Sequence, residues 1–320
     1  MKKKLVIAAI VIIAIIIAAA AALTVLPKAK AYAVSEDGVL SYGPRPAANF
    51  TITPYNETQY ATIYKIAYWS RDRTMYGLLS LPKNATQPYT AFILLPANSI
   101  PKESEQSWLG NDLNMRGYAA FSIDQRGVGQ ASDAFVDTDA DYGKFVSGGE
   151  PEEYKMYYDA LAAFDVLSWR PRFSSEYTNS APELSDELEA ITKIDRSAIY
   201  MAGESMGGRI AIIAAAMEPR IAGVMGVSTG GYGVLSHQEY SMQLFIRSID
   251  PDKYVASISP RKVLLLHSLY DQTISSLTSN RTYDHALEPK KLILDEGSDH
   301  GYYRHEKIYS LNEGLPWLTG

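Results

Sequence analysis

The chain has 320 residues, of which 47% are hydrophobic and 21% are charged, values typical of a folded globular protein. Its formal net charge of −6 argues against a nucleic-acid partner, because phosphate backbones are recognised by basic surfaces. The absence of cysteine excludes disulfides, thiol nucleophiles and cysteine metal ligands.

The N-terminal segment predicts a membrane anchor. Residues 5–26 form an uncharged apolar run. As a helix this run would be about 33 Å long, enough to cross the ~30 Å hydrocarbon core and longer than the apolar region of a cleaved signal peptide. The lysines within residues 1–4 favour a cytoplasmic N-terminus and an extracytoplasmic catalytic domain at the cell membrane. Cleavage after Ala31 or Ala33, which would release a secreted protein, is the alternative.

The rest of the chain predicts a tether and one α/β domain. Residues 27–58 are rich in Pro, Ala, Ser and Asn, as in a linker, and residues 59–320 form the predicted domain. The domain begins with two alternating apolar runs on either side of "SRDRT", which predict a β-hairpin. Short, continuously apolar runs then alternate with helical stretches. This pattern predicts a mostly parallel, doubly wound sheet with helices on both faces.

Two longer connections between predicted elements limit the size of any cap over the domain. Residues 170–196 predict a surface insertion that holds one short helix. The segment between Ser228 and Lys262 separates two predicted strands and leaves room only for a minimal cap.

The stretch "IYMAGESMGGRI" predicts a nucleophile elbow at Ser205. It holds the pattern G-x-S-x-G between a buried strand and a helical run that starts at Arg209. Glycines at Gly203 and Gly207 tolerate the strained backbone that such a serine adopts. The following helix would direct its N-terminal amides at negative charge that develops nearby.

A serine nucleophile needs a histidine base and an orienting carboxylate, and both are predicted downstream. Asp271 follows the apolar run "KVLLLHS", and His300 follows the next run, "KKLILDE". The chain order nucleophile, acid, histidine is that of the α/β arrangement. Asp250 or Asp252 would require the acid to follow the preceding strand. Asp299 is too close to His300 in sequence to reach its ring comfortably.

Two other patterns are interpreted as structural. Asp137, Asp139 and Asp141 have the spacing of a calcium loop, but position twelve is Gly148, which supplies no carboxylate. A solvated acidic loop without a metal is therefore predicted. His267 lies inside a predicted strand and is interpreted as a core histidine.

Five stretches in order carry a resemblance to a known superfamily: "SRDRTMYGLLSLP", "RGYAAFSIDQRGVGQAS", "GESMGG", "ISPRKVLLLHSLYDQTIS" and "EPKKLILDEGSDHGYY". The chain from about residue 60 resembles the α/β-hydrolases, in particular the prolyl-oligopeptidase-like and dienelactone-hydrolase-like branch of esterases and peptidases. The resemblance implies that Ser205 is the nucleophile, His300 the general base and then acid, and Asp271 the orienting carboxylate. It implies no metal and no organic cofactor.

The stretch "LLPANSIP" departs from the family pattern. Members usually carry His-Gly or a glycine-rich run after the first core strand, whereas this chain has Pro96 and Ala97. By the resemblance, the backbone amide of Met206 is the first oxyanion donor. The second would come from Asn98, through its backbone or side-chain amide, with Ser99 as the alternative.

Together these features predict a membrane-anchored serine hydrolase that cleaves carboxylic esters through an acyl-enzyme. Its partners would be a small acyl ester and, through the N-terminal helix, a membrane. A serine peptidase of the prolyl-oligopeptidase-like type is the alternative, although the tether is too short to hold a β-propeller. A second alternative is an anchored binding domain that has lost catalysis.

Overall fold

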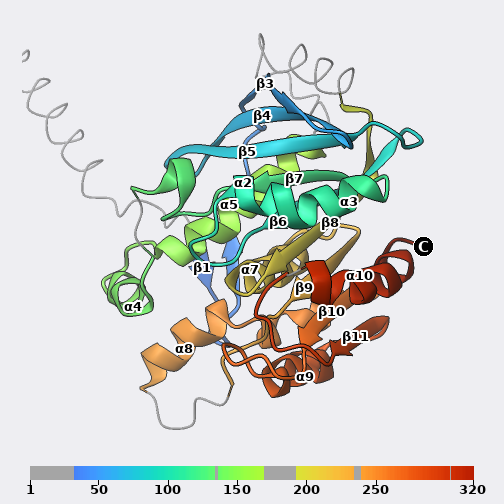
Figure 1. Ribbon diagram of the computed structural model, residues 1–320. Helices are drawn as coiled ribbons and strands as arrows, with labels where there is room; N and C mark the ends of the chain where they lie inside the picture. The colour runs from blue at the N-terminus through green and yellow to red at the C-terminus, as the bar shows by residue number, and fades with distance from the viewer. Residues whose placement is uncertain (1–31, 134–135, 169–191, 234–238, 303) are drawn as a thin grey trace, which may run out of the picture.

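A central sheet organises the computed structural model, which describes residues 32–133, 136–168, 192–233, 239–302 and 304–320 (Figure 1). In this part of the chain nine strands form one sheet in the order β11-β10-β9-β8-β6-β7-β5-β4-β3. The six strands from β11 to β7 in this order run parallel to one another. The strands β5, β4 and β3 follow β7 in antiparallel pairs. The predicted α/β class and mostly parallel sheet are confirmed.

The strands of this sheet are β3 (Phe50–Glu57), β4 (Ala61–Ser70), β5 (Arg73–Pro82), β6 (Tyr89–Leu95), β7 (Ala119–Ile123), β8 (Ile194–Glu204), β9 (Gly223–Val227), β10 (Lys262–Ser268) and β11 (Lys290–Asp295). The helices are α2 (Lys102–Glu105), α3 (Asn111–Met115), α4 (Thr138–Val146), α5 (Glu152–Leu167), α7 (Met206–Met217), α8 (Tyr240–Ile249), α9 (Ser276–His285) and α10 (Arg304–Thr319). A π-helical turn at Gln106–Gly110 joins α2 to α3.

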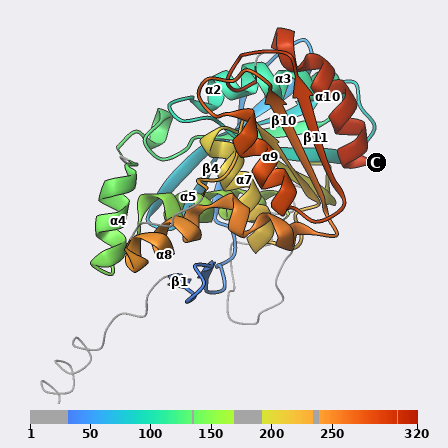
Figure 2. The same cartoon turned by 90° about the horizontal axis from the view of Figure 1, so that it is seen from below.

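Helices cover both faces of the sheet, which explains why inner strands are buried on both sides. Every residue of β7 and β9 is buried. Figure 2 shows α2, α3 and α10 on one face and α5, α7, α8 and α9 on the other. The helices therefore shield both faces of the sheet from solvent. The segment between β9 and β10 holds α8 and two short 3-10 turns, Pro251–Lys253 and Val255–Ile258.

The predicted N-terminal hairpin is confirmed as β4 and β5. Their register runs from Ala61 opposite Pro82 to Ser70 opposite Arg73. The two residues between these strands form a tight turn at the polar "RD" of the sequence.

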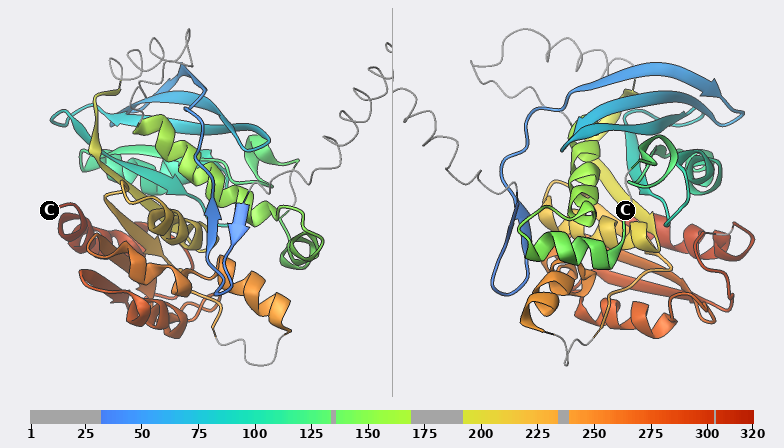
Figure 3. Two further views of the ribbon diagram at one scale, coloured as in Figure 1. Left: turned by 180° about the vertical axis from the view of Figure 1, so that it is seen from behind. Right: turned by 90° about the vertical axis from the view of Figure 1, so that its left-hand side faces the viewer.

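The tether predicted over residues 27–58 is wrong for its described part. β3 pairs antiparallel with β4 and extends the main sheet, and Phe50 is only 3% exposed. Upstream, β1 (Tyr32–Val34) and β2 (Leu40–Tyr42) form a small hairpin that lies alongside the main domain (Figure 3). The Tyr254 hydroxyl accepts a hydrogen bond of 2.8 Å from the amide of Leu40 in this hairpin. The folded domain therefore begins well before residue 59.

The acidic stretch interpreted as a solvated loop is a helix. Asp137 caps the N-terminus of α4 by accepting a hydrogen bond from the Ala140 amide. Asp141 is buried, and its two carboxylate oxygens accept hydrogen bonds of 2.8 Å from the amides of Glu152 and Glu153. Its charge therefore stabilises the N-terminus of α5.

Two predictions fall largely on residues outside those described. The apolar run 5–26 lies wholly outside them, as does most of the insertion predicted over residues 170–196. Among the residues that are described, none of the helices has the length and apolar character needed to cross a bilayer.

The position of β3 predicts the effect of truncation. A protein that starts at residue 59 loses β3 and the β1–β2 hairpin, exposes the edge of β4 and uncovers the site of Phe50. Burial of one large apolar side chain is worth about 1.5–3 kcal/mol, and each kcal/mol shifts Tm by about 2–4 °C in a domain of this size. We expect Tm to fall by roughly 5–10 °C relative to a protein that starts at residue 32, as measured by thermal denaturation. Equal Tm values would restore the tether interpretation.

Candidate active site

Ser205 lies at a strained turn between β8 and α7. Its backbone has φ 52° and ψ −116°, a conformation that costs free energy for a residue with a Cβ. Two hydrogen bonds hold the turn: the Ser205 amide donates to the Val227 carbonyl at 2.9 Å, and the Thr229 hydroxyl donates to the Ser205 carbonyl at 2.7 Å. The strand-to-helix turn expected of a nucleophile elbow is therefore present.

The flanking glycines permit a close backbone approach. A Cβ on Gly207 would lie 2.0 Å from the Leu95 carbonyl oxygen and 2.5 Å from that of Pro96. A Cβ on Gly203 would lie 2.3 Å from the carbonyl oxygen of Gly207. The motif predicts that these glycines provide backbone freedom, but the positive φ belongs to Ser205 itself. Both glycines are required because the elbow packs against neighbouring backbone.

The structure brings the three predicted residues together. The Ser205 Oγ and His300 Nε2 are 2.9 Å apart, and His300 Nδ1 lies 2.9 Å from Asp271 Oδ2. Each residue follows a strand, β8, β10 or β11, and these strands are mutually parallel through β9. Their carboxyl ends consequently meet at one edge of the sheet. The His300 side chain is 23% exposed, so this site is accessible from solvent.

Asp271 is held as a buried carboxylate. Burial acts to raise its pKa, but the hydrogen bond from His300 and those from the amides of Ile274 and Thr273 outweigh burial, so that the pKa is lower than usual. An ionised Asp271 accepts a hydrogen bond from the Nδ1–H group of His300. The Nε2 atom of the neutral ring is then an acceptor facing the Ser205 hydroxyl.

The alternative acids lie elsewhere. Asp252 pairs with Arg281 at 2.7 Å, and Asp250 accepts hydrogen bonds from backbone amides, including that of Asp252 at 3.0 Å. His267 is buried in β10, and its Nε2 lies 2.8 Å from the Ile274 carbonyl oxygen. Burial lowers the pKa of His267, which keeps the ring neutral. Its interpretation as a core histidine agrees with these contacts.

The predicted oxyanion donors lie on two segments that touch. Met206 is the first residue of α7, so its amide is among those that lack an intrahelical acceptor. The contact of Gly207 with the carbonyls of Leu95 and Pro96 brings the loop after β6 against this helix end. Asn98 is an exposed residue of that loop.

Three residues that are not among the predicted site residues support this region. The Gln125 side-chain amide donates to the Pro96 carbonyl and so ties the loop after β7 to the loop after β6. Glu204 precedes the serine and is buried, and its carboxylate accepts a hydrogen bond from the Tyr302 amide. Glu105 is also buried. Only Glu204 has a signal in the sequence, its place inside the elbow motif.

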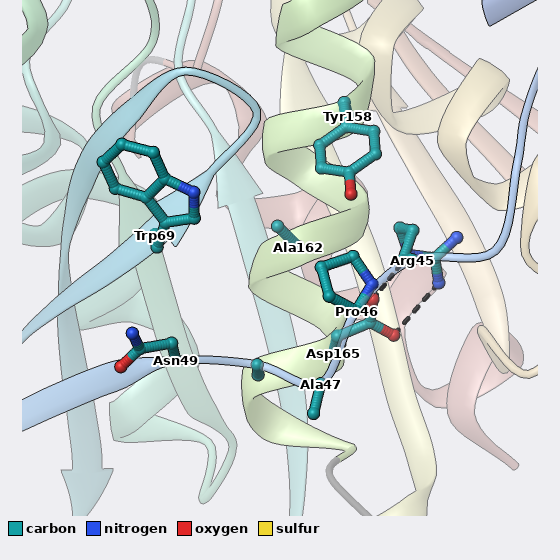
Figure 4. A pocket seen from close by; sticks show the side chains of 9 residues that line it. Arg45, Pro46, Ala47, Asn49, Trp69, Tyr158, Ala162 and Asp165 are labelled. Atoms are coloured by element: carbon teal, nitrogen blue, oxygen red, sulfur yellow. Dashed lines mark hydrogen bonds and ion pairs between the residues drawn. The ribbon is translucent and has the colours of Figure 1, made fainter. Parts of the chain in front are cut away.

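A separate pocket lies between residues 45–49, which precede β3, and the elements β4 and α5 (Figure 4). Trp69, which is 54% exposed, and Tyr158 line it, together with the ion pair between Arg45 and Asp165. None of the residues that line this pocket belongs to the group around Ser205.

Comparison with known proteins places the chain in a family. Residues 47–244, more than half of the chain, match the family described as acetyl xylan esterase (AXE1). The chain belongs to this family. The match confirms the predicted α/β-hydrolase superfamily.

A curated relative of the chain is "Uncharacterized protein YfhR" of Escherichia coli O157:H7, which is 26% identical over 199 residues. The alignment covers 61% of this chain and 56% of that relative, so the chain spans little more than half of the relative's length.

Solved structures agree on the fold. Acetyl xylan esterase 1 from Thermoanaerobacterium sp. JW/SL YS485 superposes with a TM-score of 0.60 at 14% identity, covering 85% of this chain and 88% of that one. An acetyl xylan esterase from Paenibacillus sp. R4 gives a TM-score of 0.59 at 17% identity, with 84% and 88% covered. A glucuronoyl esterase from Solibacter usitatus gives 0.52 at 14% identity, with 78% and 76% covered.

The backbone contact at Gly207 predicts that Gly207→Ala displaces the elbow. The added methyl group overlaps two backbone carbonyl oxygens, and overpacking of this kind costs about 1–3 kcal/mol. A displacement near 1 Å lowers turnover about 100-fold. We expect both effects in thermal denaturation and in hydrolysis of p-nitrophenyl acetate.

Gly143→Ala is the matched control, because Gly143 lies in α4 with no atom within 4 Å of the added Cβ. It should keep full activity and gain up to about 1 kcal/mol from helix propensity. Equal activity of the two variants would contradict the close-approach argument.

Proposed function

We propose that this chain is a carboxylic ester hydrolase that uses Ser205 as nucleophile, His300 as base and Asp271 as orienting carboxylate. The observation that carries the proposal is the hydrogen-bonded series from Ser205 through His300 to Asp271, at the carboxyl edge of the sheet. Membership of the acetyl xylan esterase family supports ester rather than peptide substrates.

Acylation begins with the Ser205 hydroxyl. As its Oγ bonds to the acyl carbon, its proton passes over 2.9 Å to Nε2 of His300. The Asp271 carboxylate, 2.9 Å from Nδ1, stabilises the imidazolium that results. The carbonyl oxygen becomes an oxyanion, for which we assign the amides of Met206 and Asn98 as donors. Collapse of this intermediate breaks the bond to the alcohol oxygen, which takes the proton from Nε2.

Deacylation repeats these steps with water. His300 removes a proton from a water molecule, whose oxygen bonds to the acyl carbon of the acyl-enzyme. The Ser205 oxygen leaves as the new intermediate collapses and recovers its proton from His300. The products are a carboxylic acid and free enzyme.

An acetyl group is the acyl group we propose, carried on the hydroxyl of a carbohydrate. The support is the family match and the names of the two acetyl xylan esterases of similar fold. Release of acetate from acetylated xylan, compared with hydrolysis of p-nitrophenyl acetate and butyrate, tests this assignment. Faster turnover of butyrate than acetate would count against it.

Substitution of the three residues tests the mechanism. We expect Ser205→Ala to abolish labelling by a fluorophosphonate probe, because the probe reacts only with an activated serine. His300→Ala should also abolish labelling. Asp271→Asn should lower kcat by about 10⁴-fold, because an amide favours the wrong histidine tautomer.

Asp252→Asn provides the control for the acid, because Asp252 pairs with Arg281 instead of contacting His300. It should keep activity within a few-fold of wild type when folded by circular dichroism. Absence of labelling in the folded wild-type protein would favour the inactive binding domain over the hydrolase.

We propose further that residues 5–26 anchor the protein in the cell membrane with the catalytic domain outside the cytoplasm. The length and lack of charge of this run support the assignment. Intact-mass analysis of the membrane fraction should therefore find the uncleaved chain. A mature N-terminus at Tyr32 or Val34 would show instead that the segment is a cleaved signal peptide.

A further inference from the structure

Two buried carboxyl groups lie next to each other, and one of them belongs to the residue that precedes Ser205. Glu204 is the last residue of β8 and is 3% exposed, and Glu105, the last residue of α2, is fully buried. The two side chains lie within hydrogen-bonding reach of each other. Among the described residues, no donor faces Oε1 of Glu204 or either carboxyl oxygen of Glu105. A proton on one of the two carboxyls is the donor that this arrangement lacks.

The surroundings decide which carboxyl holds that proton. Burial raises the pKa of Glu105 well above its usual range, and the neighbouring Glu204 raises it further. Burial also raises the pKa of Glu204, but the Tyr302 amide, the hydrogen bond with Glu105 and the nearby charges of Lys307 and His300 oppose that rise. Two ionised carboxylates in contact would repel strongly in a dry interior. Glu105 is therefore the protonated donor and Glu204 the ionised acceptor.

Glu204 also contacts the loop that carries His300. Its Oε2 accepts a hydrogen bond of 2.8 Å from the amide of Tyr302, two residues after His300. Gly301 between them has φ +90°, and a Cβ there would lie 2.8 Å from the same oxygen. The Tyr302 hydroxyl donates to Asp112 at 2.7 Å. Two hydrogen bonds of Tyr302 therefore hold the loop after His300: its backbone amide contacts Glu204 and its side-chain hydroxyl contacts Asp112.

The charge of Glu204 faces two cationic groups. Lys307 of α10 is fully buried, donates to the Ser268 hydroxyl and lies 3.8 Å from Asp295. The second group is the ring of His300, which becomes an imidazolium when it takes the serine proton. A negative charge at Glu204 stabilises that cation in addition to Asp271.

We propose that the Glu105–Glu204 pair shares one proton, positions His300 against Ser205 and stabilises the imidazolium through the ionised Glu204. The inference rests on the proposed function, since it assigns both glutamates as positioning residues of that reaction. Neither contacts the reacting atoms in this arrangement.

Glu204→Gln tests the role of the charge. The amide oxygen of glutamine still accepts the Tyr302 hydrogen bond, so only the charge is lost. We expect kcat to fall about 10- to 100-fold with KM within about twofold, because the charge acts on the transition state. The acidic limb of the kcat/KM profile should move to lower pH, because a neutral neighbour disfavours the protonated ring. Wild-type kcat and an unchanged acidic limb would overturn the electrostatic role.

Glu105→Gln tests the shared proton. The side-chain amide of glutamine donates a hydrogen bond through its own N–H group, whereas a glutamate must first be protonated. In the wild type, the unfolded chain releases the Glu105 proton above about pH 4.5 while the folded chain retains it, so stability falls as pH rises. Between about pH 5 and 8, the free energy of unfolding should therefore fall more steeply in wild type than in Glu105→Gln. Identical slopes would overturn the shared proton.

Glu313→Gln is the matched control, since Glu313 is an exposed residue of α10 that pairs with Lys291 of β11. It should leave both the rate and the pH dependence of stability unchanged.

The stability measurement can be made on the Ser205→Ala protein and needs no turnover. Failure of the proposed function would appear as an unlabelled wild-type serine, whereas failure of this inference would leave labelling intact and the Glu105→Gln slope equal to wild type.

Discussion

The geometry of the site depends on one backbone contact, the approach of the first turn of α7 to the end of β6. Leu95 pairs with Gly203 across the two strands, and Gly207 then touches the carbonyls of Leu95 and Pro96. Side chains at these positions would push the helix away from the strand. With glycines there, the strained turn at Ser205 is held by its neighbours, and the amide of Met206 is brought to the loop after β6.

His300 has a different kind of support. Ser205 lies directly between a strand and a helix, whereas His300 lies in the irregular loop between β11 and α10. Its ring is oriented by hydrogen-bonding distances to Ser205 and Asp271, and its backbone by the contact of Tyr302 with Glu204. Polar contacts therefore replace regular structure in this loop. Buried charges at such contacts add little net stability, so their value lies in orientation.

The sequence predicted those parts of the site that depend on local spacing. The elbow motif and the short apolar runs before Asp271 and His300 were sufficient, because carboxyl ends of parallel strands meet at one edge. It failed where tertiary partners outweighed local composition. The Pro- and Asn-rich composition of the stretch before residue 59 does not predict a strand. It contains β3, whose strand structure depends on pairing with β4. Asp141 resembled a solvated acid because the helix terminus that it caps begins eleven residues later.

Glu105 shows most clearly what sequence reasoning lacks. The stretch "KESEQS" has the composition of an exposed helix start, yet its last glutamate is buried against Glu204. An apolar side chain at position 204 would leave the Tyr302 amide without its acceptor and would remove one of the negative charges near the buried Lys307. Position 204 therefore requires an ionised acceptor, and position 105 must then supply a donor. Each glutamate is explained by the other, across a distance in sequence that no local pattern spans.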